Sequence, residues 1–246
     1  MSEMKQPHIR CGRSDATRFA ILPGDPERVG RVKQFLENPV DIACNREYTS
    51  CSGTYRGVKV MVVSTGIGGA STGIAIEELK NIGVETMIRI GSCGAMQGNL
   101  KLGHTIIASG AVRDDGASRA YVDPSYPAVP DPRVLAMLLE SAREQGFTHH
   151  CGLIRSHDSF YTDQEEAIDN YWSQRGILGS DMESATLFVI GSLRGLKTAS
   201  VLNVVVEQNG SLASGISGYV EGGRLTAVGE ENEIRTALGA IVKLSR

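Results

Sequence analysis

Short apolar stretches separated by turn residues divide the chain into strands and helices. Six stretches are rich in β-branched residues and are bounded by glycine, proline or polar clusters, which is typical of buried strands. These predicted strands are residues 16–22, 58–64, 86–91, 104–112, 150–156 and 198–207.

Helical patterns lie between these strands. Residues 71–82 place four apolar side chains on one face, and residues 131–146 begin with Asp131 as N-cap and Pro132 and close at Gly146. Residues 180–195 and 231–245 predict two more helices. Strands alternating with helices predict one largely parallel, three-layer α/β domain over residues 1–246, with its ligand at the carboxyl ends of the strands.

Composition narrows the classes of function. The chain has 246 residues, of which 41% are hydrophobic and 22% charged, as in ordinary globular proteins. A net charge of −3 leaves no bulk positive field for nucleic acid or an anionic membrane surface. The polar N-terminus carries no apolar signal region, and no apolar run approaches the ~20 residues of a membrane helix, so a cytoplasmic protein is expected.

The cysteines indicate no binding site, whereas the glycines indicate one. The five cysteines are scattered and form no CxxC pair, so we expect neither a disulfide framework nor a metal site built on them. Glycine is abundant, with 29 residues, and it gathers in ILPGDPERVG, STGIGGASTG and IRIGSCGAM. Glycine at strand ends lets backbone N–H groups approach an anion.

The sequence favours a phosphate ion over a dinucleotide as the ligand of these glycine-rich segments. Gly66 and Gly68 resemble part of a GxGxxG motif, but the next strand ends in Arg89, Gly91 and Ser92 instead of an acidic residue that would hold a ribose. An arginine beside glycine and serine suits phosphate. This signal disfavours a nicotinamide-dependent dehydrogenase.

Three arginines lie in polar or glycine-rich junctions beside predicted strand ends. Arg28, Arg46 and Arg89 are expected to grip a small anion together with the Ser92 hydroxyl and the Gly24 amide. Arg89 lies inside an apolar strand, where an unpaired charge is costly, so it needs a partner.

Several motifs in order resemble a known family over almost the whole chain. These segments are LPGDPERV, NREYTS, STGIGGASTGIAIEEL, IRIGSCGA, VRDDGAS, YPAV, DSFY and DMESATL. They are similar to nucleoside phosphorylases of the hexameric type, and most similar to the uridine phosphorylase branch. The resemblance implies an α/β/α fold with a central mixed, barrel-like sheet. It also implies a homohexamer, a trimer of dimers, that catalyses reversible phosphorolysis with orthophosphate as co-substrate and needs no cofactor.

The resemblance assigns the phosphate and sugar sites by motif. It implies that two dimer-related subunits share each active site. The phosphate-binding residues would be Gly24, Arg28, Arg89 and Ser92, with Arg46 from a neighbouring subunit. The pentose-binding residues would be Met182 and Glu183, with His8 from the neighbour. Arg28, Arg89 and Glu183 would carry catalysis, because arginines position phosphate against C1′ and a carboxylate favours developing oxocarbenium charge. The family also allows a monovalent cation such as K⁺ near Glu47, Ile67 and Ser71.

The base site departs from the family pattern. Phe160 resembles the aromatic residue that packs on the sugar or base, and Val205 and Val206 stand where purine enzymes carry an acid. Gln164 matches a glutamine that reads the pyrimidine edge, whereas Glu166 replaces an arginine. The remaining expected base-binding residues are Cys93 and Gly94 of RIGSCG.

Two further positions differ from the uridine branch. Gln208 replaces a common arginine, and Asp181 replaces the usual glutamate before Met-Glu.

These departures leave the substrate open. Uridine is the first hypothesis. The alternative within the family is a purine nucleoside phosphorylase that uses Glu166, Glu207 or Asp163 at the base. A nucleosidase and a non-catalytic nucleoside-binding protein are further alternatives, and ribose is not distinguished from 2′-deoxyribose. Residues 209–230 are rich in glycine and serine, which is compatible with a flap over the site or a plain surface loop.

Overall fold

A closed barrel of five strands organises the computed structural model, which describes residues 4–208, 210 and 223–246. The sheet has nine strands in the order β2-β3-β4-β1-β5-β8-β7-β6-β9, and an additional β5–β9 pairing closes the last five into the barrel. The strands are β1 (Phe19–Pro23), β2 (Glu37–Asn45), β3 (Tyr48–Tyr55), β4 (Val58–Val63), β5 (Thr86–Ala95), β6 (Thr105–Asp114), β7 (His149–His157), β8 (Gly179–Asp181) and β9 (Lys197–Val206).

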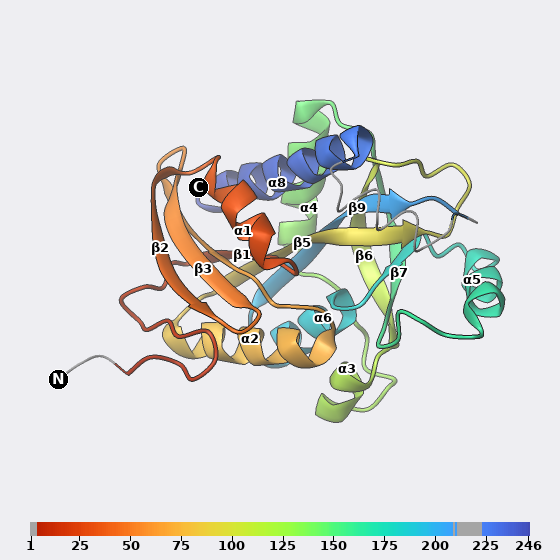
Figure 1. Cartoon of the computed structure of the whole chain (residues 1–246), viewed down its shortest axis with the longest axis horizontal. Coiled ribbons are helices and arrows are strands. Elements are labelled where there is room, and N and C mark those ends of the chain that lie inside the picture. The colour runs from red at the N-terminus through yellow and green to blue at the C-terminus, as the bar shows by residue number, and fades with distance from the viewer. Residues whose placement is uncertain (1–3, 209, 211–222) are drawn as a thin grey trace.

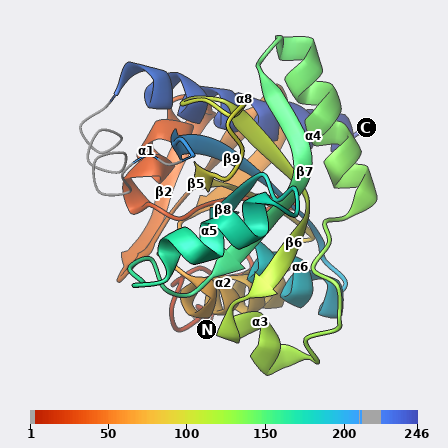
Figure 2. The same cartoon turned by 90° about the vertical axis from the view of Figure 1, so that its right-hand side faces the viewer.

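Helices cover the sheet on two faces, and together they confirm the expected three layers (Figure 1). The described helices are α1 (Pro26–Lys33), α2 (Gly69–Ile82), α3 (Gly116–Tyr121), α4 (Pro132–Gln145), α5 (Glu165–Ser173), α6 (Ser184–Leu193) and α8 (Arg224–Leu244). One apolar core joins α2 and α6 to the sheet, and a second joins α1, α4 and α8 to its other face. Helix α5 stands apart from both layers and contains no buried residue (Figure 2).

Local sequence explains the elements that were predicted correctly. All five residues of β1 are buried, as expected for a continuous apolar run. The Asp131 side chain caps α4 by accepting hydrogen bonds from the backbone N–H groups of Arg133 and Val134, and Gly146 ends the helix with a φ of 72°. None of the described helices is long and apolar enough to cross a membrane.

Other expectations need correction. The alternation of strands and helices predicted a largely parallel sheet, which is wrong, because β2–β3, β3–β4, β5–β8 and β6–β9 are antiparallel. The mixed, barrel-like sheet that the family resemblance implied is confirmed. The predicted helix 180–195 begins only at Ser184, since Gly179–Asp181 pairs with β5 and β7 as strand β8. The proposed flap falls mostly outside the described residues, and its last part, from Arg224, belongs to helix α8.

Candidate active site

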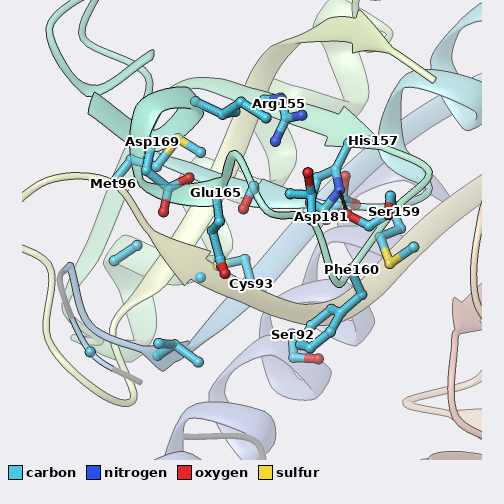
Figure 3. Close-up of a pocket in the computed structure, with 18 of the residues that line it drawn as sticks. Ser92, Cys93, Met96, Arg155, His157, Ser159, Phe160, Glu165, Asp169 and Asp181 are labelled. Carbon is cyan, nitrogen blue, oxygen red and sulfur yellow. Dashed lines mark hydrogen bonds between the residues drawn. The ribbon is translucent and has the colours of Figure 1, made fainter. Parts of the chain in front are cut away.

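A cavity of about 920 Å³ opens beside the barrel, between the ends of β5, β7, β8 and β9 and helix α5 (Figure 3). The predicted strand 86–91 continues to Ala95, because Gly94 pairs with both Ser180 and Val206. Ser92, Cys93 and Gly94 therefore belong to strand β5, not to a loop, and they line this cavity.

Arg89 has the partners that its apolar strand position required. Its side chain is 5% exposed. Nε donates to Oδ2 of Asp181 at 2.9 Å, and Nη2 lies 2.5 Å from Oε2 of Glu183. Burial by itself lowers the pKa of Arg89, but the two carboxylates outweigh it and raise the pKa above its ordinary value. Nη1 is buried and has no hydrogen-bond partner within the described residues.

Asp181 is the centre of a hydrogen-bond network that sequence reasoning did not find. Besides binding Arg89, its carboxylate accepts from the hydroxyls of Ser156 at 2.5 Å and Ser184 at 2.6 Å. The backbone N–H of Ser184 also donates to it, at 3.0 Å. Asp181 therefore joins β5, β7 and the start of α6. Its position directly before Met-Glu was the available signal, since a buried acid there matches the charge of Arg89.

Glu183 lies at the turn into α6 and is 5% exposed. Its Oε1 accepts from the backbone N–H of Gly68 at 2.6 Å, and its Oε2 accepts from that of Met182 at 3.2 Å. Burial raises the pKa of Glu183 above its ordinary value, although the Arg89 guanidinium opposes this shift. The structure thus brings together Arg89, Met182 and Glu183 as the sequence predicted.

Arg28 lies behind this network rather than on the cavity wall. Its Nε donates to Glu230 at 3.0 Å, and its Nη1 lies 3.5 Å from Oε1 of the fully buried Glu233. Glu233 also accepts from the backbone N–H of Gly91, and burial raises its pKa to about 8. The two glutamates of α8 were not anticipated, because their distance in sequence from Arg28 gives no signal.

Glycine is required where Arg89 folds back over its own strand. A Cβ on Gly91 would lie 2.5 Å from Nη2 of Arg89. Gly24 lies on the neighbouring strand end, where a Cβ would be 3.8 Å from Nη1 of Arg89. Arg28, Arg89, Gly24 and Ser92 thus surround one strand end, although only Ser92 of these four lines the cavity.

The two residues expected from a neighbouring subunit form no hydrogen bond or ion pair with this set in the described part of the chain. Arg46 is exposed at the β2–β3 turn, where its φ is 54°. His8 is half-buried and its ring binds Glu78 at 2.6 Å.

The residues expected near a monovalent cation meet around Gly66. A Cβ there would lie 2.7 Å from Cγ of Glu47 and 3.3 Å from Oγ of Ser71, which itself donates to the carbonyl of Ile67. No cluster of three or more His, Cys, Asp or Glu side chains able to hold a metal ion occurs in the described part of the chain.

Most predicted base-binding residues line the cavity, but Gln164 does not. Phe160, Glu166, Val205 and Val206 join Cys93 and Gly94 in the wall. Burial raises the pKa of the Cys93 thiol well above its ordinary value, so the thiol stays protonated and cannot act as a nucleophile near neutral pH.

Sequence reasoning missed several cavity residues, among them the ionisable side chains of Arg155, His157, Glu165 and Asp169. Figure 3 shows Arg155 and Asp169 near one end of the cavity and Ser92 at the other. Partial desolvation in the cavity lowers the pKa of His157 and raises that of Asp169. The signal available for Arg155 was the same as for Arg89, a charged residue inside an otherwise apolar strand.

Comparison with known proteins shows the family and the fold. The model of the phosphorylase superfamily matches residues 18–215. A uridine phosphorylase from Thermococcus kodakarensis is 42% identical over 214 residues, 82% of this chain and 77% of that protein. A guanosine phosphorylase from Halorubrum lacusprofundi is 38% identical over 211 residues, 86% of both proteins. The crystal structure of a uridine phosphorylase from Vibrio fischeri superposes with a TM-score of 0.92 at 42% identity and covers 99% of each chain.

The barrel, the site and these matches define the class: the chain belongs to the phosphorylase superfamily. Within it, the protein is an enzyme of the nucleoside phosphorylase family, a pentosyltransferase whose substrates are a nucleoside and phosphate.

Proposed function

We propose that the protein catalyses the reversible phosphorolysis of uridine to uracil and ribose 1-phosphate. The observation that carries this proposal is the buried Arg89 guanidinium, which binds Asp181 and Glu183 and keeps Nη1 without a partner among the described residues. A buried, unpaired N–H donor is costly, and an anion at this point would satisfy it.

Phosphate binds at the strand ends around Arg89 in this proposal. The Gly24 backbone approaches Nη1 of Arg89, and the Ser92 hydroxyl faces the cavity three residues further along the strand. Arg28 adds a second positive charge, held in place by Glu230 and Glu233. Fixing phosphate against C1′ turns a bimolecular encounter into a local displacement.

Ribose binds over Met182 and Glu183. A carboxylate oxygen has two acceptor positions, and Oε1 of Glu183 uses one for the Gly68 N–H. A sugar hydroxyl takes the other. The negative charge of Glu183 then lies near the pentose ring and stabilises the oxocarbenium charge that develops as the glycosidic bond breaks.

Two features support uracil as the base. The paired apolar side chains of Val205 and Val206 line the cavity, so no acid stands there to protonate a purine. Uridine phosphorylases from Thermococcus kodakarensis and Klebsiella aerogenes are 42% and 37% identical to this chain.

Guanosine is the second candidate. Glu165, Glu166, Asp169 and Glu207 line the cavity, and carboxylates accept hydrogen bonds from the N–H groups that guanine presents. The guanosine phosphorylase of Halorubrum lacusprofundi, at 38% identity, supports this alternative.

A nucleoside panel with and without phosphate tests the proposal. Wild-type protein is expected to release uracil from uridine only when phosphate is present, and Glu183→Gln serves as the inactive control. Cleavage of guanosine but not uridine would select the second candidate. Base release in phosphate-free buffer would instead indicate a nucleosidase, and no turnover of any nucleoside would indicate a binding protein.

We also propose that the active enzyme is a hexamer whose dimers share active sites through Arg46 and His8. The exposure of Arg46, and of Ile67 beside the sugar site, supports a covering partner. Arg46→Ala and Glu183→Gln proteins, each nearly inactive alone, are expected to regain activity when their subunits are exchanged. Absence of complementation in verified mixed dimers would contradict shared sites.

A further inference from the structure

Arg155 is a buried charge at the end of the cavity away from Ser92 (Figure 3). It lies near the end of β7, and it is 7% exposed. Among the described residues that line the cavity, it is the single arginine or lysine. Burying a guanidinium costs free energy, so the orientation and hydrogen-bond partners of Arg155 indicate which group it binds.

Asp114 holds the guanidinium in one orientation. Both Nε and Nη2 of Arg155 bind the same Oδ2 atom of Asp114, at 2.8 and 2.7 Å. Arg119 forms an ion pair with the other oxygen of this carboxylate, its Nη2 lying 3.6 Å from Oδ1 of Asp114. The remaining edge of Arg155, at Nη1, has no recorded hydrogen bond within the part of the chain that the structure describes. A clamped guanidinium with one open edge on a cavity wall is a preorganised donor.

Acceptors stand on the same part of the wall. Asp169, on α5, lines the cavity near enough for Arg155 to lower its pKa against the raising effect of burial. Glu165, one helical turn before Asp169, lines the cavity as well. Donor and acceptors therefore face one space, which is the arrangement that a base edge with a carbonyl oxygen and a neighbouring N–H requires.

Two other cavity residues present no positive charge to a base. Glu166 carries only acceptors, and the Gln208 amide donates to the hydroxyl of Ser173 at 3.0 Å. Arg155 therefore provides the positive charge among the described residues of the cavity wall.

We propose that Arg155 determines base specificity by donating a hydrogen bond from its open edge to a ring carbonyl oxygen, while Asp169 accepts from the adjacent ring N–H. The substrate class is then nucleosides whose base carries a carbonyl next to a ring N–H, namely uracil, thymine and the 6-oxopurines. Cytosine and adenine present an amino group and an unprotonated ring nitrogen at these positions, which would leave Arg155 without an acceptor. This inference rests on the proposed phosphorolysis and narrows its substrate.

The same contact assists the reaction. A phosphate oxygen forms a bond to C1′ as the bond from C1′ to the base nitrogen breaks, and the bonding electron pair leaves with the base. Negative charge spreads onto the ring carbonyl oxygens, and the base is then protonated by solvent. A hydrogen bond from Arg155 strengthens as this charge grows, so it stabilises the transition state more than the bound substrate.

The test measures kcat/KM for uridine, cytidine, guanosine and adenosine, and KM for phosphate, in wild-type protein and in Arg155→Met. Wild-type protein is expected to prefer uridine to cytidine, or guanosine to adenosine, by at least about 100-fold. Arg155→Met should lower kcat/KM for the preferred nucleoside by about 10- to 100-fold, since it removes a charge-assisted hydrogen bond. The kcat/KM for cytidine or adenosine, which lack the ring carbonyl at this position, should change less than about twofold. The KM for phosphate should also change less than about twofold.

Two further variants separate base reading from a structural role. Arg119→Met removes another arginine from Asp114 without touching the cavity, and it should leave the discrimination ratio unchanged. Asp169→Asn, at an exposed position on α5, should reduce the uridine-to-cytidine ratio while folding normally.

The possible results separate the role of Arg155 from the proposed phosphorolysis. Equal loss on all nucleosides in Arg155→Met, an unchanged discrimination ratio, or a wild-type preference for cytidine or adenosine would overturn the role of Arg155 while leaving phosphorolysis intact. If wild-type protein released no base from any nucleoside, the proposed function would fall, and this inference with it.

Discussion

The two ends of the cavity are built in different ways. The inner end is lined by Asp181 and Glu183, and Arg89 lies behind them, bound to both carboxylates. Each of the three is about 5% exposed or less, on strands and a helix start packed on the closed barrel. The outer end is formed by β7 and by α5, a helix without a buried residue. At the inner end the guanidinium and the two carboxylates form ion pairs with one another. The carboxylates of α5 form no ion pair among the described residues.

The two ends of the cavity therefore differ in how well they tolerate substitution. At the inner end a substitution leaves a buried partner uncompensated, so both catalysis and stability suffer. On α5 an acidic side chain can be replaced by a basic one with little effect on the free energy of unfolding. The fold therefore maintains one reaction while the outer wall is free to select the base. The following changes test this contrast, beginning with the largest expected effect.

Arg89→Met should lower kcat/KM by at least about 1,000-fold, because it removes the guanidinium nearest the expected phosphate. It should also lower the free energy of unfolding by about 3–5 kcal/mol, since Asp181 and Glu183 lose their buried counter-charge. Urea unfolding and steady-state kinetics measure the two effects. Arg89→Lys keeps the charge and should recover stability better than activity; near-wild-type activity in the methionine variant would refute this role.

Gly91→Ala should lower kcat/KM by about 100-fold. A Cβ at this position would lie 2.5 Å from Nη2 of Arg89 and displace a guanidinium that two carboxylates hold. Gly30→Ala is the control, because nothing lies within 4 Å of its Cβ position, and alanine in helix α1 should stabilise by up to about 1 kcal/mol. If Gly91→Ala retained full activity, the packing of Arg89 over this strand would not matter for catalysis.

Glu233→Gln should flatten the pH dependence of stability. The pKa of Glu233 is about 8 in the folded protein, against 4.5 for an unperturbed glutamate, so the folded state binds an extra proton between these values. Stability then decreases as pH rises from 4.5 towards 8, by at most about 1.4 kcal/mol per pH unit. Urea unfolding at pH 5, 6, 7 and 8 measures the slope. An identical slope in the glutamine variant would mean that Glu233 does not titrate in this range.

Glu166→Arg should have the smallest effect, a rise of about three- to tenfold in kcat/KM for uridine, because it returns a hydrogen-bond donor to the outer wall. The free energy of unfolding should stay within about 0.5 kcal/mol of wild type, as expected for an exposed position. Glu37→Arg, an equal charge change at an exposed position of β2, controls for net charge. A large loss of stability in Glu166→Arg would remove the contrast between the two ends.

Much of the fold was predictable because local patterns and tertiary structure agree there. Strands β4 and β9 match their predicted ranges within one residue at each end, and α4 lies between its predicted cap residues. Strands β2 and β3 were missed, since β2 contains Pro39 and is largely exposed, and β3 is mostly polar. Strand β2 pairs with β3 and β3 pairs with β4, and no local pattern predicts these pairings.

The inner site was foreseen in part. The need of Arg89 for a partner follows from its apolar neighbours, but the motif assigned Glu183 to the pentose and did not name it as that partner. Asp181 as the second partner, and Glu230 and Glu233 behind Arg28, were not foreseen, because each pair is joined by contacts between residues far apart in the chain.

The alternation of strands and helices, the clustering of glycine near strand ends and the presence of buried charges that need partners all follow from the amino-acid sequence. They depend on local periodicity and on the free-energy cost of burying an unpaired charge. The closure of the barrel by β5 and β9, the pairing of particular charges, and the position of Arg155 on the cavity wall with Nη1 unbonded appear only in the folded chain. Those facts depend on the register of strands paired across the whole chain, and a hydrophobic pattern along the sequence carries no record of that register.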